Sequence, residues 1–308
     1  MKTFANLRLI LIIVLLLSAT VSVIPQQSSV QPEWIPPSPR PKALTLFAPK
    51  PIGGDNIFKG EAEVWLADAI EKIEADALIP IKDKSVSDYV SQVGKNLAKY
   101  SVKPDKNYEF IVLNDEEENA MNVGGGRIYI NLGMLKSVES EDELAGILAH
   151  EIGHDAFGHA AKTVTRQLFW MKGIRKVKTP EEVKSALETL DEAYEKNLFA
   201  AFGESLLGFS RFNELEADRA AFYNIYKAGY NPSALISVMN KFEREEKKEM
   251  GKNYGAYQFL TFLFGSHPPT AQRSTAFSWE SNFVKMPPKD ARYKNPAFDA
   301  MKAKAAKL

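Results

Sequence analysis

The sequence predicts an α+β fold that is mostly helical, with one small sheet. Apolar side chains recur at helical spacing over residues 60–77 and 86–99, and the second of these helices opens at Ser85. Two shorter runs, residues 108–113 and 127–131, alternate between apolar and polar side chains as strands do. Residues 52–308 are therefore expected to form a single domain, which is long enough to bury a core of its own.

The first 51 residues are expected to precede that domain. Residues 1–24 place Lys2 and Arg8 before an apolar run and end in small or polar side chains, which is the layout of a secretory signal. An uncleaved membrane anchor is the alternative, although its apolar stretch falls short of the roughly 20 residues of a span. Either reading predicts an extracytoplasmic, periplasmic protein. Residues 25–51 contain eight prolines and are expected to form an extended linker.

Three further helices are predicted from their first residues. A Ser, Thr or Asn that can cap a helix stands before a glutamate or a proline in each case. The three signals are Ser140 with Glu143, Thr179 with Pro180 and Glu182, and Asn231 with Pro232.

Composition narrows the classes of function. The formal net charge is zero, whereas a nucleic-acid-binding domain usually carries a basic excess. Cysteine is absent, which excludes disulfides, thiolate ligands and cysteine nucleophiles. A transition-metal site in this chain would have to use His, Asp and Glu.

The sequence His-Glu-Ile-Gly-His at residues 150–154 is the strongest chemical signal. Spacing of four places His150 and His154 on one helical face, where both can bind the same ion. Glu151 lies beside them, within reach of a water molecule on that ion. The alternative is a buried helix with two hydrogen-bonded histidines, but this pattern indicates one zinc ion per chain.

Two residues compete for the third ligand position. His159 follows His154 by five residues, one short of the metzincin spacing, so a supporting or surface role is expected for it. Glu214 and Asp218 are four apart on one face of a probable helix, whereas Glu216 should point elsewhere. Ligating histidines usually donate their second nitrogen to a carboxylate, which favours Glu214 as the ligand and Asp218 as that carboxylate.

These motifs resemble those of the HtpX-like and CAAX-prenyl-protease-type zinc metallopeptidases, which are gluzincins with a glutamate as third ligand. The matching segments are residues 150–154, the Ser-Arg-x-x-Glu-x-Glu-Ala-Asp block at 210–218, and His-Pro-x-Thr-x-x-Arg at 267–273. Residues 119–133 are similar to the family's edge strand beside the cleft. The resemblance implies Glu214 as zinc ligand and a place in the exported, soluble or singly anchored branch, which is associated with quality control of envelope proteins.

The expected reaction is hydrolysis of peptide bonds in exported, unfolded or misfolded polypeptides, with Glu151 as general base. The strand formed by Arg127, Ile128, Tyr129 and Ile130 is expected to be the sheet edge on which a substrate adds as a further strand. A partner at the membrane surface or in outer-membrane assembly is also expected. The basic, aromatic segment 162–178 is interpreted either as a mobile loop near the cleft or membrane, or as a solvated helix extension.

His267 is expected to act at the metal site, on the strength of the His-Pro-x-Thr-x-x-Arg resemblance. Its ring could donate a hydrogen bond to the developing oxyanion, or it could occupy the open position on zinc as a reversible lock. Arg273 could pair with Asp218 and fix this segment.

Two other classes of function remain open at this stage. A zinc-binding holdase would keep the site without cutting, and a scaffold with a structural metal would close the site with four protein ligands.

Overall fold

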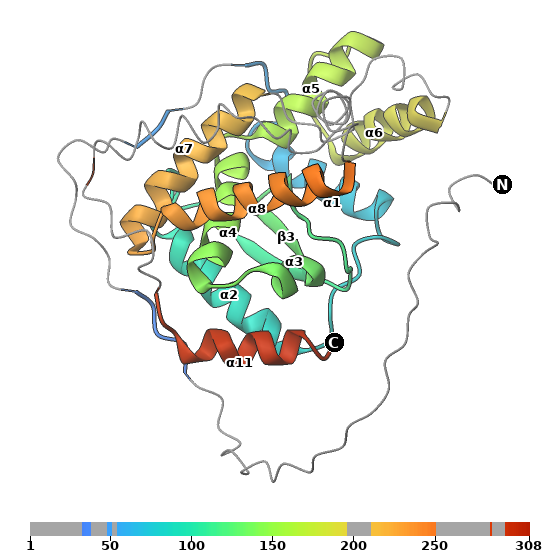
Figure 1. Ribbon diagram of the computed structural model, residues 1–308. Coiled ribbons are helices and arrows are strands. Elements are labelled where there is room, and N and C mark those ends of the chain that lie inside the picture. The colour runs from blue at the N-terminus through green and yellow to red at the C-terminus, as the bar shows by residue number, and fades with distance from the viewer. Residues whose placement is uncertain (1–32, 38–47, 51–53, 196–210, 251–283, 285–292) are drawn as a thin grey trace. The chain divides into compact units, whose positions relative to one another are not determined.

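The computed structural model describes residues 33–37, 48–50, 54–195, 211–250, 284 and 293–308. The segment predicted to be a signal, and both His267 and Arg273, lie outside these residues. The described part is mostly helical with one three-stranded sheet, as predicted (Figure 1). Its elements are α1 (Glu61–Ile73), α2 (Lys84–Ala98), β1 (Glu109–Leu113), β2 (Ala120–Gly124), β3 (Arg127–Asn131), α3 (Leu132–Ser137), α4 (Glu141–Ala156), α5 (His159–Lys172), α6 (Pro180–Glu195), α7 (Arg211–Ala228), α8 (Ser233–Met250) and α11 (Pro296–Ala305).

The sheet corrects one sequence prediction. Its strand order is β1-β3-β2, with β1 parallel and β2 antiparallel to β3. Arg127, Ile128, Tyr129 and Ile130 therefore belong to the central strand, and the prediction that they form the edge is wrong. The glycines at 124–126 all have positive φ and fold β2 back onto β3, while β1 takes the other side of β3. The edge strands of the described sheet are β1 and β2, and β2 is the one that packs closely against α4.

The helix boundaries also differ slightly from those predicted from the spacing of apolar side chains. α1 ends at Ile73, four residues before the predicted end, and α2 begins at Lys84. Asp83 is the N-cap of α2, since its Oδ1 accepts the N–H groups of Ser85 at 2.9 Å and Val86 at 3.1 Å. α5 continues to Lys172, so the mobile-loop reading of residues 162–172 is wrong and this part is a helix.

Helix α4 occupies the centre of the fold. All of its residues are buried, and α7, α8 and the strands β2 and β3 pack around it (Figure 1). The predicted cap is present, because the Glu143 N–H donates to Ser140 Oγ at 3.3 Å. A continuous hydrophobic core joins α2, the sheet, α4, α7 and α11, and a second cluster lies among α1, α5 and α6.

The first turn of α4 forms hydrogen bonds to residues that are distant in the sequence. The buried Glu141 carboxylate accepts hydrogen bonds from Trp34 Nε1 at 3.0 Å, Tyr230 Oη at 2.8 Å, Asn295 Nδ2 at 2.7 Å and the Tyr89 hydroxyl. Trp34 also packs against the hydrophobic core. Residues 33–37 therefore belong to the folded body, and the expectation that all of residues 25–51 form a linker is wrong for this part.

Among the residues that the structure describes, no helix is both long enough and apolar enough to cross a membrane.

Candidate metal centre

Two histidines of α4 meet on its buried face. His150 and His154 are one helical turn apart, and their Nε2 atoms lie 2.9 Å from each other. Their ring centroids are 4.5 Å apart with the planes at 75°. His154 is fully buried and His150 is 6% exposed. Both rings thus present Nε2 to the same small volume.

Helix α7 brings Glu214 to the same point. Glu214 Oε1 lies 3.3 Å from His154 Nε2, and Glu214 Oε2 lies 3.5 Å from His150 Nε2. The approach depends on Gly153, because a Cβ at that position would stand 2.9 Å from the Ala217 carbonyl oxygen. The glycine of the motif therefore lets the backbones of α4 and α7 come close enough for the carboxylate to reach the histidines.

The donor set fits a zinc ion. Ligand atoms at about 2.0–2.2 Å from a tetrahedral zinc lie about 3.3 Å from one another. The three separations here are 2.9, 3.3 and 3.5 Å, and these are the residues of the described chain that could together hold a metal ion. Two imidazoles and a carboxylate leave the fourth position of a tetrahedral ion open, as catalytic zinc sites do.

Asp218 lies one turn beyond Glu214 and holds the other side of His150. Asp218 Oδ1 is 3.0 Å from His150 Nδ1. Burial alone would lower the pKa of His150, but the hydrogen bonds that its ring donates to Asp218 and Glu214 raise this pKa to about 9. For His154 burial dominates and lowers the pKa. Such a contact is what a carboxylate that orients a metal-binding histidine would make, and this role of Asp218 stays a prediction.

Glu151 lies between the two histidines in sequence and faces the sheet. It is 2% exposed, and Asn122 Nδ2 of β2 lies 3.4 Å from its Oε2. The candidate base and the edge strand are thus neighbours. Sequence reasoning did not single out Asn122, because nothing in its local pattern marks it.

His159 and Glu216 are more deeply placed than the sequence suggested. His159 is fully buried, with its Nδ1 2.9 Å from His154 Nδ1 and its Nε2 3.2 Å from Glu216 Oε2. Glu216 is 6% exposed and does not belong to the group of His150, His154 and Glu214 that could hold a metal ion. The contact between Glu216 and His159 was not predicted, because it joins α5 to α7 across 57 residues of sequence.

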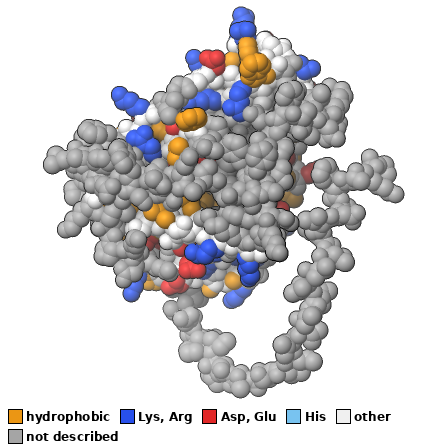
Figure 2. Space-filling view, turned by 45° about the horizontal axis from the view of Figure 1, so that its top comes forward, with side chains coloured by type: hydrophobic (Ala, Val, Ile, Leu, Met, Phe, Trp, Pro, Cys, Tyr) orange, Lys and Arg blue, Asp and Glu red, His pale blue; other side chains and the backbone are white. Residues whose placement is uncertain are grey.

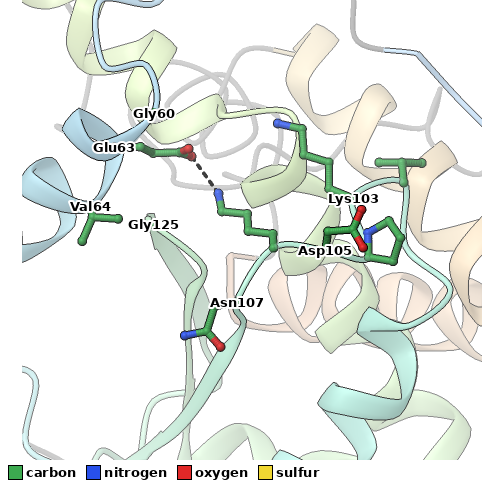
Figure 3. Close-up of a pocket in the computed structure, with 10 residues that line it drawn as sticks. Gly60, Glu63, Val64, Lys103, Asp105, Asn107 and Gly125 are labelled. Carbon is green, nitrogen blue, oxygen red and sulfur yellow. Dashed lines mark hydrogen bonds and ion pairs between the residues drawn. The ribbon is translucent and has the colours of Figure 1, made fainter.

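A buried ion pair secures the end of α4. Lys106 Nζ lies 2.6 Å from Asp155 Oδ2 and 2.9 Å from Glu63 Oε1. Asp155 Oδ1 also accepts the Gly126 N–H at 2.9 Å, which ties α4 to the turn between β2 and β3. A pocket of about 500 Å³ opens beside Glu63 and Gly125 (Figure 3). None of the candidate metal ligands lines this pocket, so we assign it no part in the metal centre.

Comparison with known families shows to which protein family the chain belongs. The model of peptidase family M48 matches residues 84–280, which is more than half of the chain and includes α4 and α7. The chain belongs to peptidase family M48. The resemblance to zinc metallopeptidases that the sequence motifs carried is therefore confirmed at the level of the family.

Relatives within peptidase family M48 are proteases of bacteria and mitochondria. The beta-barrel assembly-enhancing protease of Escherichia coli is 24% identical over 170 residues, which cover 52% of this chain and 33% of that protein. The mitochondrial metalloendopeptidase OMA1 of Schizosaccharomyces pombe is 29% identical over 185 residues, covering 60% and 50%. The metalloprotease YcaL of Escherichia coli is 26% identical over 193 residues, covering 60% and 68%. The chain thus spans a third to a half of the first two relatives.

Proposed function

We propose that this protein is a zinc-dependent endopeptidase that hydrolyses unfolded polypeptides outside the cytoplasm. The observation that carries the proposal is the convergence of His150, His154 and Glu214 on one point, with Glu151 beside them. In this assignment the two histidines and Glu214 hold one zinc ion, and Asp218 orients His150. Membership of peptidase family M48 supports the assignment.

Glu151 would perform the proton transfers of the reaction. The ion supplies a Lewis acid that makes a water molecule acidic near neutral pH and polarises the peptide carbonyl. Glu151 would take a proton from the attacking water as the water adds to the carbonyl carbon, and would then pass this proton to the leaving amine nitrogen. Asn122 Nδ2, at 3.4 Å, donates to the Glu151 carboxylate and aims it.

We assign the substrate-binding edge to β2 in place of β3. Within the described residues β2 pairs on one side only, with β3, so its other side offers main-chain groups to an extended peptide. Asn122 lies on this strand, which puts a bound peptide next to Glu151. Main-chain pairing is only weakly selective for sequence, and this favours unfolded chains as substrates.

The two rival classes are less well supported. A holdase that does not cut would have no need of a general base, and Glu151 is present at the centre. A closed structural site needs a fourth protein ligand, and the described residues contribute three. His267 as a permanent fourth ligand would revive that reading, and zinc content together with proteolysis separates the alternatives.

Location and partners belong to the same proposal. The signal-like N-terminus supports a periplasmic location, and the name of one relative, a beta-barrel assembly-enhancing protease, supports a partner in outer-membrane assembly. Basic and hydrophobic side chains lie together on one face of the molecule (Figure 2). Trp170 at the end of α5 is 77% exposed, and Lys172 and Arg175 next to it are exposed too, which supports contact with an anionic membrane surface.

The test compares Glu151→Gln with the wild-type protein. Glutamine keeps the shape of the side chain but cannot accept the proton, so hydrolysis of unfolded casein should fall to background while zinc stays near one ion per chain. A chelator should abolish wild-type hydrolysis, and added zinc should restore it. Normal turnover by Glu151→Gln would refute the role of the base. Wild-type protein that binds zinc but cuts no polypeptide would favour the holdase.

A further inference from the structure

His159 returns to the metal centre because the chain turns sharply after α4. Helix α4 ends at Ala156, and Gly158 adopts a left-handed conformation with φ 65° before α5 begins at His159. This turn places the His159 ring against His154, with ring centroids 4.9 Å apart and the two Nδ1 atoms 2.9 Å apart. On its far side, His159 Nε2 lies 3.2 Å from Glu216 Oε2.

Binding of a metal through His154 fixes the direction of both hydrogen bonds. His154 presents Nε2 to Glu214 and His150, so a bound ion takes the lone pair of Nε2 and the ring proton stays on Nδ1. This Nδ1–H then donates to His159 Nδ1. A His159 ring that accepts through Nδ1 carries its proton on Nε2, and it donates that proton to Glu216.

The geometry of α7 explains why a second imidazole stands between ligand and carboxylate. Glu214 and Glu216 are two residues apart, about 200° around a helix, so they project to different sides of α7. Glu214 reaches the metal centre directly, while Glu216 contacts His159 of α5. The His159 ring bridges the remaining gap. Both ligand histidines thus end on a carboxylate of α7, His150 directly on Asp218 and His154 through His159.

We propose that His159 and Glu216 are positioning residues that orient the His154 ring and hold it in the tautomer that binds zinc. The proposal rests on the proposed zinc site. All three side chains are nearly or fully buried, where hydrogen bonds are electrostatically stronger and an unmet donor is more costly than in water. The chain of contacts runs in series, so losing either member disconnects His154 from the carboxylate.

The test measures zinc affinity by competition with a chromogenic chelator at neutral pH. His159→Phe keeps the volume of a ring but removes both hydrogen bonds, and we expect the zinc dissociation constant to rise about 10- to 100-fold. His159→Asn keeps an acceptor near the Nδ1 position and should recover part of this loss. Visible absorption of the cobalt-substituted protein should change in His159→Phe, because the ligand ring is no longer held. Unaltered zinc affinity in His159→Phe would overturn the proposal.

A double-variant cycle distinguishes a relay from two independent effects. Glu216→Gln alone should weaken zinc binding, because a neutral amide oxygen accepts the His159 Nε2–H less strongly than a carboxylate does, but it should add nothing to His159→Phe, which lacks that hydrogen bond. Additive losses would contradict the relay. Val164→Ala is the matched control, since Val164 is fully buried on the same helix but belongs to a separate hydrophobic cluster. It should lower thermal stability and leave zinc affinity unchanged.

The same data separate this proposal from the zinc site on which it rests. Glu214→Ala should lose zinc almost completely, and a wild-type protein without zinc, or a Glu214→Ala variant that binds like wild type, would overturn both. Zinc binding that fails in Glu214→Ala but matches the wild type in Glu216→Gln overturns the relay alone. Glu216→Gln changes only one atom type, so it also provides the test if His159→Phe does not fold.

Discussion

Replacing Lys106 by methionine should destabilise the fold strongly, because it leaves a carboxylate buried without its cation. The Asp155 side chain is 0% exposed, and its closest charged partner is Lys106 Nζ at 2.6 Å. Methionine retains the aliphatic stem of lysine and removes the charge. Breaking a buried pair by removing one partner costs about 3–5 kcal/mol. The Gly126 N–H at 2.9 Å continues to compensate Asp155 in part, which places Lys106→Met at about 3 kcal/mol.

Asp155→Asn and the double variant separate the energy of the Lys106–Asp155 pair from the other effects of Lys106→Met. Asp155→Asn keeps an oxygen for the Gly126 N–H and leaves Lys106 with Glu63 at 2.9 Å. Its cost should be about 1–2 kcal/mol, since Lys106 is 17% exposed and stays paired. In the double variant position 155 carries no charge, and the loss of the cation beside Glu63 is the same as in Lys106→Met, so it cancels from the coupling. The double variant should therefore be less destabilised than the sum of the single variants, with a coupling of about 2 kcal/mol.

The assay is equilibrium unfolding in urea with a chelator present, so that zinc binding does not contribute to the free energy of unfolding. Circular dichroism measures the loss of helix as urea rises. The free energies of unfolding of the wild type, the two single variants and the double variant then give the coupling energy. A Lys106→Met protein within about 0.5 kcal/mol of wild type would refute the reasoning. Strict additivity of the two single variants would refute it as well, because the energy would then not belong to the pair.

Two further predictions concern other sites. Tyr89→Phe removes a donor to the buried Glu141 and should lower stability by about 1.5–3 kcal/mol at neutral pH. Burial already raises the pKa of Glu141, so its ionisation opposes folding, and the deficit in urea unfolding should be smallest in acid and grow as the pH rises; a deficit that shrinks with rising pH would contradict this. His267→Ala should speed casein hydrolysis if His267 locks the centre, the role we favour, and slow it by about 10²-fold if it assists the oxyanion. Unchanged activity would exclude both roles.

The parts of the site that could be predicted are those encoded by local spacing. A spacing of four from His150 to His154 dictates a shared helical face, and the Ser140 cap marks where that helix begins. The structure brings Glu214 and Asp218 to the positions expected of a ligand and its helper, because they too are one turn apart. Spacing within one helix places these side chains on a common face in any fold that forms the helix.

The parts that failed depend on which elements meet in space. Strand 127–131 alternates in the same way whether it lies at an edge or in the centre, so its pattern could not reveal that both β1 and β2 pair with it. Trp34 lies in a proline-rich segment, yet it docks on Glu141 across 107 residues. The contact between His159 and Glu216 is equally remote in sequence. Composition and periodicity do not indicate which residues remote in sequence come into contact.

Zinc analysis of the Glu214→Ala variant decides whether Glu214 holds a metal ion together with His150 and His154. Wild-type protein and variant are purified in parallel, dialysed against metal-free buffer and measured by atomic emission together with protein concentration. We expect close to one zinc ion per wild-type chain and almost none in Glu214→Ala, since two histidines alone hold zinc weakly. A Glu214→Ala protein that retains one zinc ion per chain would contradict the assignment of the metal centre.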